Sequence, residues 1–231
     1  MDDGHIIVVK LGGSLAGSQH LIDWVNALAN CGGRSVIVPG GGPFADAVRQ
    51  AQTKIGFGDA AAHHLALLAM EQFGWALASL SSNFCVVDST AAIRRVLRAG
   101  NVAIWSPVKM VLSCADIPPS WEITSDSLAV WLAGQIGARQ LVLVKHGGAF
   151  GNPLHAIDLA ACGIVDQAFP RFLASTGVPT SLVAAEASAS ARKAITECRI
   201  AGTPIDLHER VVRRLLAPLW PKSKNHAGDG H

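Results

Sequence analysis

The chain has 231 residues, half of them hydrophobic and 16% charged, which allows one sizeable hydrophobic core. A formal net charge of +2 argues against a nucleic-acid-binding protein, because such proteins usually carry a concentrated basic face. The five cysteines are scattered without a CxxC pair. This pattern argues against a disulfide scaffold or a zinc site and favours reduced thiols in the cytoplasm.

Strand-like and helix-like segments alternate along the chain. In chain order we expect a strand over 6–11, a helix over 20–30, a strand over 35–39, helices over 43–56 and 59–80, a strand over 84–88, a helix over 91–100, a strand over 101–105, a helix over 123–138 and a strand over 140–145. Beyond residue 150 we expect helices near 157–174 and 188–201, a strand over 179–185 and a last helix over 208–217. Continuously apolar strands separated by helices predict an α/β fold, with a parallel sheet covered on both faces.

The sequence contains no clear linker, so we expect a single domain over residues 1–220 and a disordered tail over 221–231. The weakest internal boundary lies near residue 140 and divides the domain into lobes of about 1–139 and 140–220. The most apolar predicted helix, 59–80, contains histidine and glutamate, which a membrane span of about 20 apolar residues would exclude. We expect this helix to be buried in the protein or at a subunit interface.

Two glycine-rich segments follow the first two predicted strands: LGGS at 11–14 and PGGGP at 39–43. In parallel sheets, ligands bind beyond the carboxyl ends of the strands, where these loops lie. Glycine lets backbone N–H groups approach an anion closely, and the second loop leads into a helix, whose N-terminus favours negative charge. Ordinary strand–helix turns are the alternative, but two such loops on consecutive strands favour a phosphate site.

Two lysines end apolar strands, and glycine-rich sequence follows each of them. Lys10 precedes LGGS, and Lys145 precedes HGGAFG. A buried ammonium group is costly without an anion, so the pair suggests a shared phosphoryl group, although each lysine alone could extend to solvent. Asp126 lies in the first turn of the helix predicted over 123–138. It is either an anchor that orients the two lysines or an ordinary helix-start carboxylate.

In four segments, VKLGGS, VPGGGPFADAVR, TSDSLAVWLA and LVLVK, the chain resembles the amino acid kinase family. The resemblance spans about residues 6–210. It implies a three-layer αβα sandwich with a mostly parallel central sheet, in which the N-terminal lobe holds the acceptor and the C-terminal lobe holds ATP. It also implies ATP-dependent phosphotransfer with Mg²⁺, in a fold that commonly forms homodimers or higher homo-oligomers.

The resemblance implies catalytic roles for Lys10, Asp126 and Lys145, with both lysines on the transferring phosphoryl group. The residues expected to bind phosphate or nucleotide lie in the two loops and after Lys145; they are Gly12, Gly13, Ser14, Gly40, Gly41, Gly42, His146, Gly147 and Gly151. Many members of the family carry an acidic residue after the late strand, where this chain has His146. No metal ligand is assigned in the chain.

The segments GGGPFADAVR, AAHHLALLAMEQFGWALA and PPSWEITSDSLAVWLAG are most similar to one group of the family. This group phosphorylates aminomethylfuran-methanol phosphate in the synthesis of methanofuran-type cofactors. The resemblance implies transfer from ATP to a phosphate monoester, which gives a diphosphate. We expect the acceptor to contact Arg49, Trp121 and Ser125, although a solvated arginine and a packed tryptophan are comparable interpretations of the first two.

Two other functions remain open. The chain could be a kinase of another small phosphate or carboxylate acceptor, because the pocket and not the fold decides the acceptor. It could also be a non-catalytic nucleotide- or oxyanion-binding protein of the same fold. Asp46, His63 and His64 are weaker candidates for the acceptor pocket, and Lys109 is expected at the surface. No nucleic-acid or membrane partner is expected.

Overall fold

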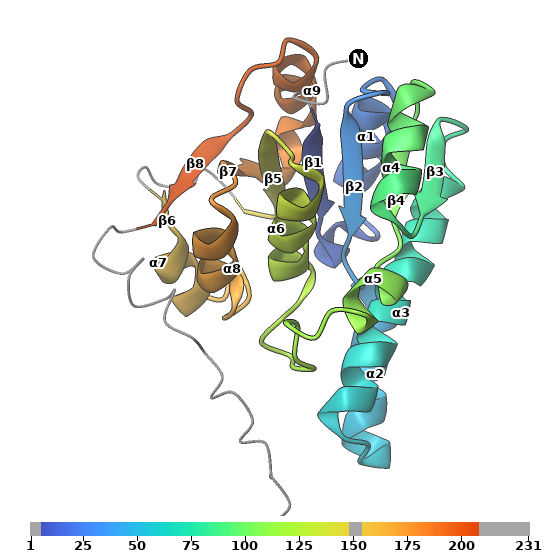
Figure 1. Cartoon of the computed structure of the whole chain (residues 1–231), viewed down its shortest axis with the longest axis vertical. Coiled ribbons are helices and arrows are strands. Elements are labelled where there is room, and N and C mark those ends of the chain that lie inside the picture. The colour runs from blue at the N-terminus through green and yellow to red at the C-terminus, as the bar shows by residue number, and fades with distance from the viewer. Residues whose placement is uncertain (1–5, 148–153, 208–231) are drawn as a thin grey trace, which may run out of the picture.

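A computed structural model describes residues 6–147 and 154–207 of the chain. These residues form one eight-stranded sheet with helices on both faces (Figure 1). The strands are β1 (Ile7–Leu11), β2 (Ser35–Pro39), β3 (Phe84–Val87), β4 (Val102–Trp105), β5 (Gln140–Lys145), β6 (Leu154–His155), β7 (Thr180–Ala184) and β8 (Thr203–Asp206). The helices are α1 (Gln19–Ala29), α2 (Gly42–Ile55), α3 (Asp59–Ala78), α4 (Thr90–Arg98), α5 (Val108–Leu112), α6 (Ser125–Ile136), α7 (Ala156–Ala161), α8 (Phe169–Thr176) and α9 (Ser188–Thr196).

The strand order is β3-β4-β2-β1-β5-β7-β8-β6, and the pairs are parallel except for β7 with β8. Strand β1 therefore lies in the middle of the sheet, where Ile7 pairs with Ser35 on one side and with Gln140 on the other. This mostly parallel sheet confirms the predicted α/β fold class. It also brings the glycine-rich loops after β1 and β2 to the same edge as the end of β5, because parallel strands end together.

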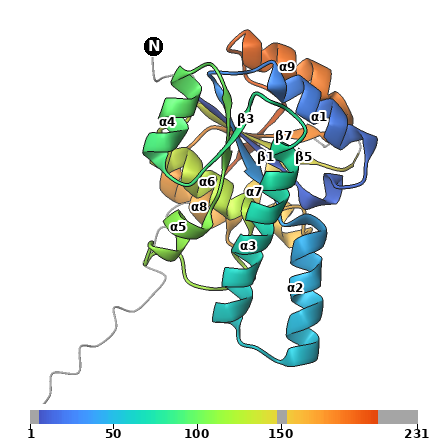
Figure 2. The ribbon, with the colours of Figure 1, turned by 90° about the vertical axis from the view of Figure 1, so that its right-hand side faces the viewer.

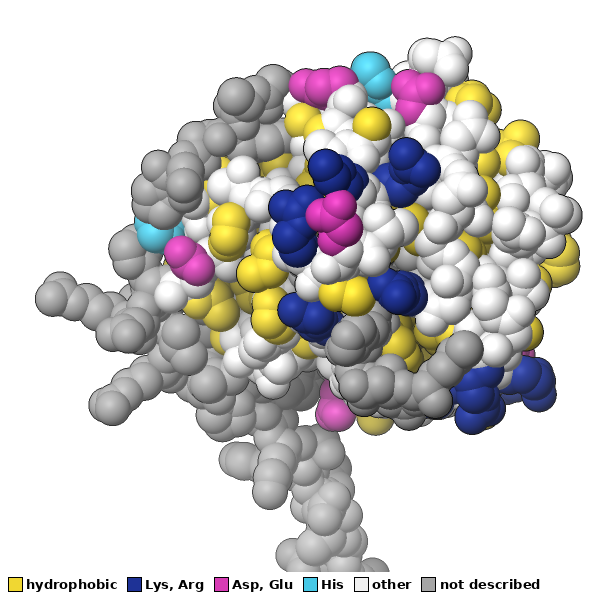
Figure 3. Space-filling view, turned by 90° about the horizontal axis from the view of Figure 1, so that it is seen from above, with side chains coloured by type: hydrophobic (Ala, Val, Ile, Leu, Met, Phe, Trp, Pro, Cys, Tyr) yellow, Lys and Arg dark blue, Asp and Glu magenta, His cyan; other side chains and the backbone are white. Residues whose placement is uncertain are grey.

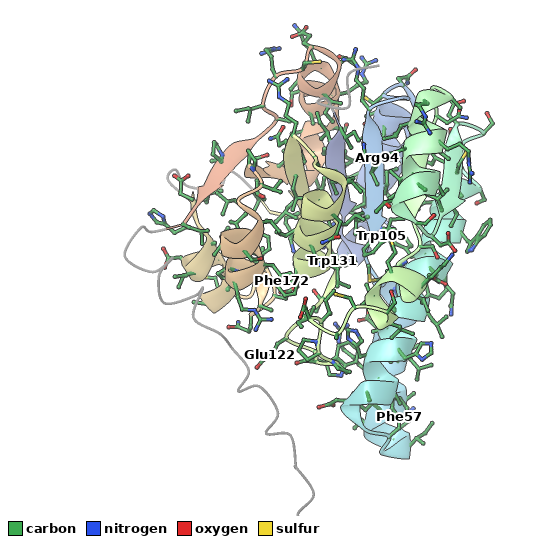
Figure 4. The ribbon with its side chains drawn as sticks, in the orientation of Figure 1. Phe57, Arg94, Trp105, Glu122, Trp131 and Phe172 are labelled. Atoms are coloured by element: carbon green, nitrogen blue, oxygen red, sulfur yellow. The ribbon has the colours of Figure 1, made fainter. Side chains whose placement is uncertain are left out.

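Helices form a layer on each face of the sheet (Figure 2). Helices α4, α6 and α8 cover one face, and α1 and α9 cover the other. The apolar side chains of each strand alternate between the two layers, since successive residues of a strand point to opposite faces. On β1, Val8 packs in the core that includes α6, whereas Val9 packs in the core that includes α1. Trp105 on β4 contacts Trp131 on α6 at 6.0 Å between ring centroids (Figure 4).

Helices α2 and α3 form a hairpin that extends beyond the sheet, with Phe57 in the connection between them (Figure 4). One side of α3 is buried through Leu67, Phe73 and Leu77, whereas Trp75 is 64% exposed. The helix is therefore only partly buried within one chain, and its role at a subunit interface stays a prediction. Among the described residues, no helix is both long and apolar enough to span the membrane.

The differences from the sequence-based expectations lie mainly in the C-terminal half. The helix predicted over 188–201 ends at Thr196, and the region near 157–174 holds two short helices. Three short elements were not predicted, namely α5, β6 and β8; β8 contains Pro204, which argues against a strand when only the sequence is read. The helix predicted over 208–217 and the tail over 221–231 lie outside the described residues.

Figure 3 looks down on the molecule from the top of Figure 1. The face that it shows is remote from the carboxyl ends of the central strands. Lysine and arginine side chains on this face have acidic side chains among them (Figure 3). This mixed distribution agrees with the small net charge of +2. The glycine-rich loops after β1 and β2 lie at the opposite end of the sheet.

Candidate active site

Strand geometry places Lys10 and Lys145 on the same face of the sheet. Lys10 is two residues after Val8, so it points toward the layer that contains α6. In the adjacent strand, Leu143 pairs with Lys10, and Lys145 follows two residues later on that same face. The two ammonium groups therefore converge beneath α6, at the carboxyl ends of two neighbouring strands.

Asp126 lies between the two lysines. Lys145 Nζ donates a hydrogen bond to Asp126 Oδ2 at 2.8 Å, and Lys10 Nζ lies 2.8 Å from Asp126 Oδ1. The second contact is an ion pair without hydrogen-bond alignment, and Oδ1 accepts no hydrogen bond from the described residues. Lys10 and Asp126 are each only 4% exposed. The structure thus joins the three predicted catalytic residues in one buried Lys–Asp–Lys cluster.

The charges of this cluster shift the pKa values of Asp126 and Lys145. Burial alone would raise the pKa of Asp126, but the ammonium groups of Lys10 and Lys145 outweigh burial and hold this pKa at about 2. Burial and the neighbouring Lys10 lower the pKa of Lys145 to about 8, against the opposing effect of Asp126. Two cations share one carboxylate, so the cluster has an excess positive charge that suits a phosphoryl group.

The two glycine-rich loops touch each other beside this cluster. A Cβ atom on Gly13 would lie 2.2 Å from the backbone nitrogen of Gly42, and a Cβ atom on Gly40 would lie 2.5 Å from the backbone nitrogen of Gly13. On Gly12, a Cβ atom would lie 3.6 Å from Lys10 Nζ. The loops therefore require glycine for close packing, and the Lys10 ammonium group lies next to Gly12 in the first of them.

We expect the substitution Gly13→Ala to force the two loops apart, because its methyl group would overlap the backbone of Gly42. The expected result is a loss of about 1–3 kcal/mol in the free energy of unfolding, together with a fall in kcat of about 10²-fold. Thermal unfolding and steady-state kinetics measure both quantities. The matched control is Gly58→Ala, where a Cβ atom would meet nothing within 4 Å and the φ angle is −74°. Wild-type values for Gly13→Ala would show that the contact between the loops is dispensable.

A cavity of about 290 Å³ opens next to the loops, between the α2–α3 hairpin and the segment that leads into α6. It is lined by Gly13, Ser14, Gly41, Gly42, Ala45, Asp46, Arg49, His63, Ala66, Leu67, Met70, Ser120, Trp121, Ile123, Thr124, Ser125 and Leu128. The predicted acceptor residues Arg49, Trp121 and Ser125 are therefore together in one cavity. Its walls combine apolar side chains with polar groups, which is typical of a small-molecule site.

Trp121 forms a fixed wall of this cavity. Its Nε1 donates a hydrogen bond to Gln52 Oε1 at 2.7 Å, and the Arg49 guanidinium lies 4.7 Å from the centroid of the indole ring. Arg49 also pairs with Asp46 at 2.9 Å. These contacts connect the loop before α6 to helix α2 and fix the position of this wall of the cavity.

The structure places the remaining candidates in different surroundings. His63 is buried and lines the cavity, and burial lowers the pKa of its imidazole. His64 is exposed and does not line the cavity. Lys109 forms an ion pair with Asp88 at 3.0 Å and is 68% exposed, so the prediction of a surface lysine is confirmed.

His146 joins the end of β5 to the first glycine loop, since its Nε2 lies 3.0 Å from the carbonyl oxygen of Ser14. Gly147 follows with a φ angle of +131°, a conformation that favours glycine. Gly151 lies outside the described residues.

Sequence reasoning missed Asp166, which lies between α7 and α8. Its carboxylate accepts hydrogen bonds from the backbone and side chains of Thr124 and Ser127, at the start of α6. The only sequence signal was the cluster of Thr and Ser residues around Asp126, which needs a partner at a helix start. The position of that partner, about 40 residues away, could not be deduced from the spacing.

The described residues do not form a metal site of their own. They contain no group of three or more His, Cys, Asp or Glu side chains placed to hold an ion. Both oxygens of Asp126 already face lysine ammonium groups. The residues therefore fit an anion, whereas a cation would have to be held mainly by a bound phosphate.

Two packed glycine loops and a buried Lys–Asp–Lys cluster, at one edge of a mostly parallel sheet, form a site that suits a phosphoryl group. The model of the amino acid kinase family matches residues 5–147. The chain therefore belongs to the amino acid kinase family, and its class of activity is phosphotransfer.

The chain is similar to one curated protein in sequence and to solved structures in fold. A curated protein from Methanocaldococcus jannaschii, (5-(aminomethyl)furan-3-yl)methyl phosphate kinase, is 29% identical over 177 residues, which cover 72% of this chain and 82% of that protein. The uridylate kinase structure from Archaeoglobus fulgidus has a TM-score of 0.65 at 16% identity and covers 87% of this chain and 100% of that chain. The UMP kinase structure from Bacillus anthracis has a TM-score of 0.65 at 15% identity, and the match covers 87% of this chain and 96% of that chain. At such identities the structures show a shared fold alone.

Proposed function

We propose that this protein transfers the γ-phosphoryl group of ATP to the phosphate of a small monoester and forms a diphosphate. The observation that carries the proposal is the buried cluster of Lys10, Asp126 and Lys145 beside a cavity of about 290 Å³. The best-supported acceptor is aminomethylfuran-methanol phosphate, an intermediate of methanofuran-type cofactors. This choice rests on the relative from Methanocaldococcus jannaschii and on the size and lining of the cavity.

In this proposal the acceptor phosphate lies at the glycine loops, with its ring in the cavity. An oxygen of the acceptor phosphate attacks the γ-phosphorus of ATP, the bond from that phosphorus to the β–γ bridging oxygen breaks, and ADP leaves. Lys10 and Lys145 neutralise the oxygens of the transferring group, while Asp126 holds the two ammonium groups in place. Phosphoryl transfer needs mainly positioning and charge stabilisation, so no covalent intermediate on the protein is required.

ATP is proposed as the donor because the family is a family of kinases. Mg²⁺ is proposed as the counter-ion that accompanies ATP, since the described residues form no site for it. The state of assembly is proposed to be a homodimer or higher homo-oligomer, and the location to be the cytoplasm. In each case the support is the resemblance to the family rather than a contact in the structure.

The proposal is tested by incubation of the purified protein with Mg-ATP and synthetic aminomethylfuran-methanol phosphate. Mass spectrometry should detect ADP and a diphosphate product in equal amounts. UMP and the analogous furan phosphate without the amine serve as comparison acceptors. Product from UMP alone would identify another acceptor, and ATP binding without any product would favour a non-catalytic nucleotide-binding protein.

We expect Trp121→Ala to raise the KM for the acceptor about tenfold with little change in the KM for ATP. The indole ring lines the cavity and stacks with Arg49, and the loss of such an aromatic contact costs about 1.4 kcal/mol. Initial rates over a range of acceptor concentrations measure the effect. Trp75→Ala, at an exposed tryptophan of α3 that does not line the cavity, is the control. An unchanged acceptor KM for Trp121→Ala would place the ring of the acceptor elsewhere.

A further inference from the structure

The short segment between α7 and α8 contacts the start of α6 through Asp166. Oδ2 of Asp166 accepts hydrogen bonds from the backbone nitrogen of Thr124 at 2.9 Å, from Thr124 Oγ1 at 2.8 Å and from the backbone nitrogen of Ser127 at 3.0 Å. Oδ1 accepts a fourth hydrogen bond, from Ser127 Oγ. A single carboxylate therefore binds four donors in the first turn of one helix.

These contacts replace the usual local cap of a helix. The first N–H groups of a helix have no partner within it, and a side chain at the N-cap position commonly supplies one. Thr124 occupies the N-cap position of α6, but its side chain caps none of the helix N–H groups. Its hydroxyl donates to Asp166 instead. A second contact lies close by, since the backbone nitrogen of Ala168 donates to the carbonyl oxygen of Glu122 at 3.1 Å.

The anchored turn is the one that carries the centre of the Lys–Asp–Lys cluster. Asp126 lies directly before Ser127 and two residues after Thr124, so both of its flanks are fixed by Asp166. Ser125, the other residue between these anchors, lines the acceptor cavity. A displacement of this turn would move Asp126 relative to the two lysines and would change the cavity at the same time.

We propose that Asp166 is a positioning residue, which fixes the first turn of α6 so that Asp126 stays between Lys10 and Lys145. It touches neither substrate nor the reacting atoms in this proposal. Burial and the neighbouring Asp126 raise the pKa of Asp166, against the hydrogen bonds from Ser127 and Thr124. Of the described groups that face Lys145, Lys10 lowers its pKa, whereas Asp126 and, more weakly, Asp166 raise it.

Two substitutions separate the hydrogen bonds from the charge. Asp166→Asn keeps the shape of the side chain: its amide oxygen can accept from Thr124 and from the backbone of Ser127, and its amide nitrogen can donate to Ser127 Oγ, because a hydroxyl accepts as well as donates. Asp166→Ala removes both the hydrogen bonds and the charge. Asp158→Asn, an exposed carboxylate on the adjacent α7, controls for the change in net charge.

The expected results differ between the variants. Asp166→Ala should lower kcat about 10²-fold and raise the acceptor KM, because the turn that holds Asp126 and Ser125 is no longer fixed. Asp166→Asn should keep kcat at pH 7 within about threefold and move the basic limb of the kcat profile to lower pH, because Lys145 loses a carboxylate neighbour. Asp158→Asn should change neither quantity.

The role of Asp166 in turnover rests on the proposed function, so a second readout does not use activity. The ¹³Cε resonance of Lys145, assigned with Lys145→Arg, is titrated in the wild type, where the midpoint should be near pH 8, and in Asp166→Asn, where it should be lower. A shifted resonance in a protein without kinase activity would support the contact and contradict the proposed function. An unchanged Lys145 titration in a folded Asp166→Ala, or wild-type kcat and KM in that variant, would overturn the inference.

Discussion

The substitution Lys10→Ala is expected to lower kcat by about 10²–10³-fold while the protein stays folded. In the proposed mechanism Lys10 is one of the two cations that face the transferring phosphoryl group, and the loss of one preorganised donor in a dry site has an effect of this size. The fold should persist because Asp126 keeps its hydrogen bond to Lys145 at 2.8 Å. Steady-state kinetics with Mg-ATP and the acceptor, together with circular dichroism, measure the two effects.

Two further variants make this result interpretable. Lys10→Met keeps most of the side-chain volume and removes the charge, so it should lose activity as Lys10→Ala does without leaving a cavity. Lys109→Ala removes a lysine that is 68% exposed and should leave kcat unchanged. Near wild-type turnover in either Lys10 variant would show that Lys10 does not act on the phosphoryl group.

The substitution Asp126→Asn is expected to have the largest combined effect on activity and stability. It leaves two neighbouring ammonium groups without a counter-ion, and the removal of one partner from a buried ion pair costs about 3–5 kcal/mol. Activity should fall at least about 10²-fold, because the lysines lose the group that orients them and Lys145 loses the neighbour that keeps it protonated. Thermal unfolding and kinetics test both effects.

The pH dependence of this variant has a definite sign. The pKa of Lys145 in the folded wild type is about 8, below the ordinary value of 10.5, and the loss of Asp126 should lower it further. Between the folded and unfolded pKa values the unfolded chain binds more protons, so stability rises with pH in this range. The melting temperature of Asp126→Asn should therefore recover, relative to the wild type, from pH 7 to pH 9. A constant difference across that range would show that the destabilisation is not electrostatic.

The parts of the fold that followed from the sequence were those with simple periodicity. The alternation of strands and helices up to residue 145 predicted the parallel sheet, and the run IIVVKL indicated a buried strand that ends in a lysine. The period of two residues within a strand then places Lys10 on the face of Val8. Short elements escaped prediction because β6 has only two residues and β8 contains Pro204.

The candidate site was predictable where its chemistry lies in one contiguous segment. The glycine loops and the lysine before each glycine-rich run could be recognised because a phosphate site needs those residue types together. The pairing of Lys10 with Leu143 could not be deduced, because register depends on the whole sheet. For the same reason the hydrogen bond from Trp121 to Gln52, across 69 positions, and the cap from Asp166 were accessible only from the structure.

The central place of β1 in the sheet has a consequence for how the protein is made. Ile7 pairs with Ser35 early in the chain, but its other neighbour, Gln140, is synthesised much later. Until then one edge of β1 and the side chain of Lys10 lack their partners, and a growing chain exposes an apolar strand edge that favours aggregation. The order in which the ribosome delivers these strands therefore leaves one edge of β1 open until β5 emerges, and the Lys–Asp–Lys cluster forms only after both halves have been translated.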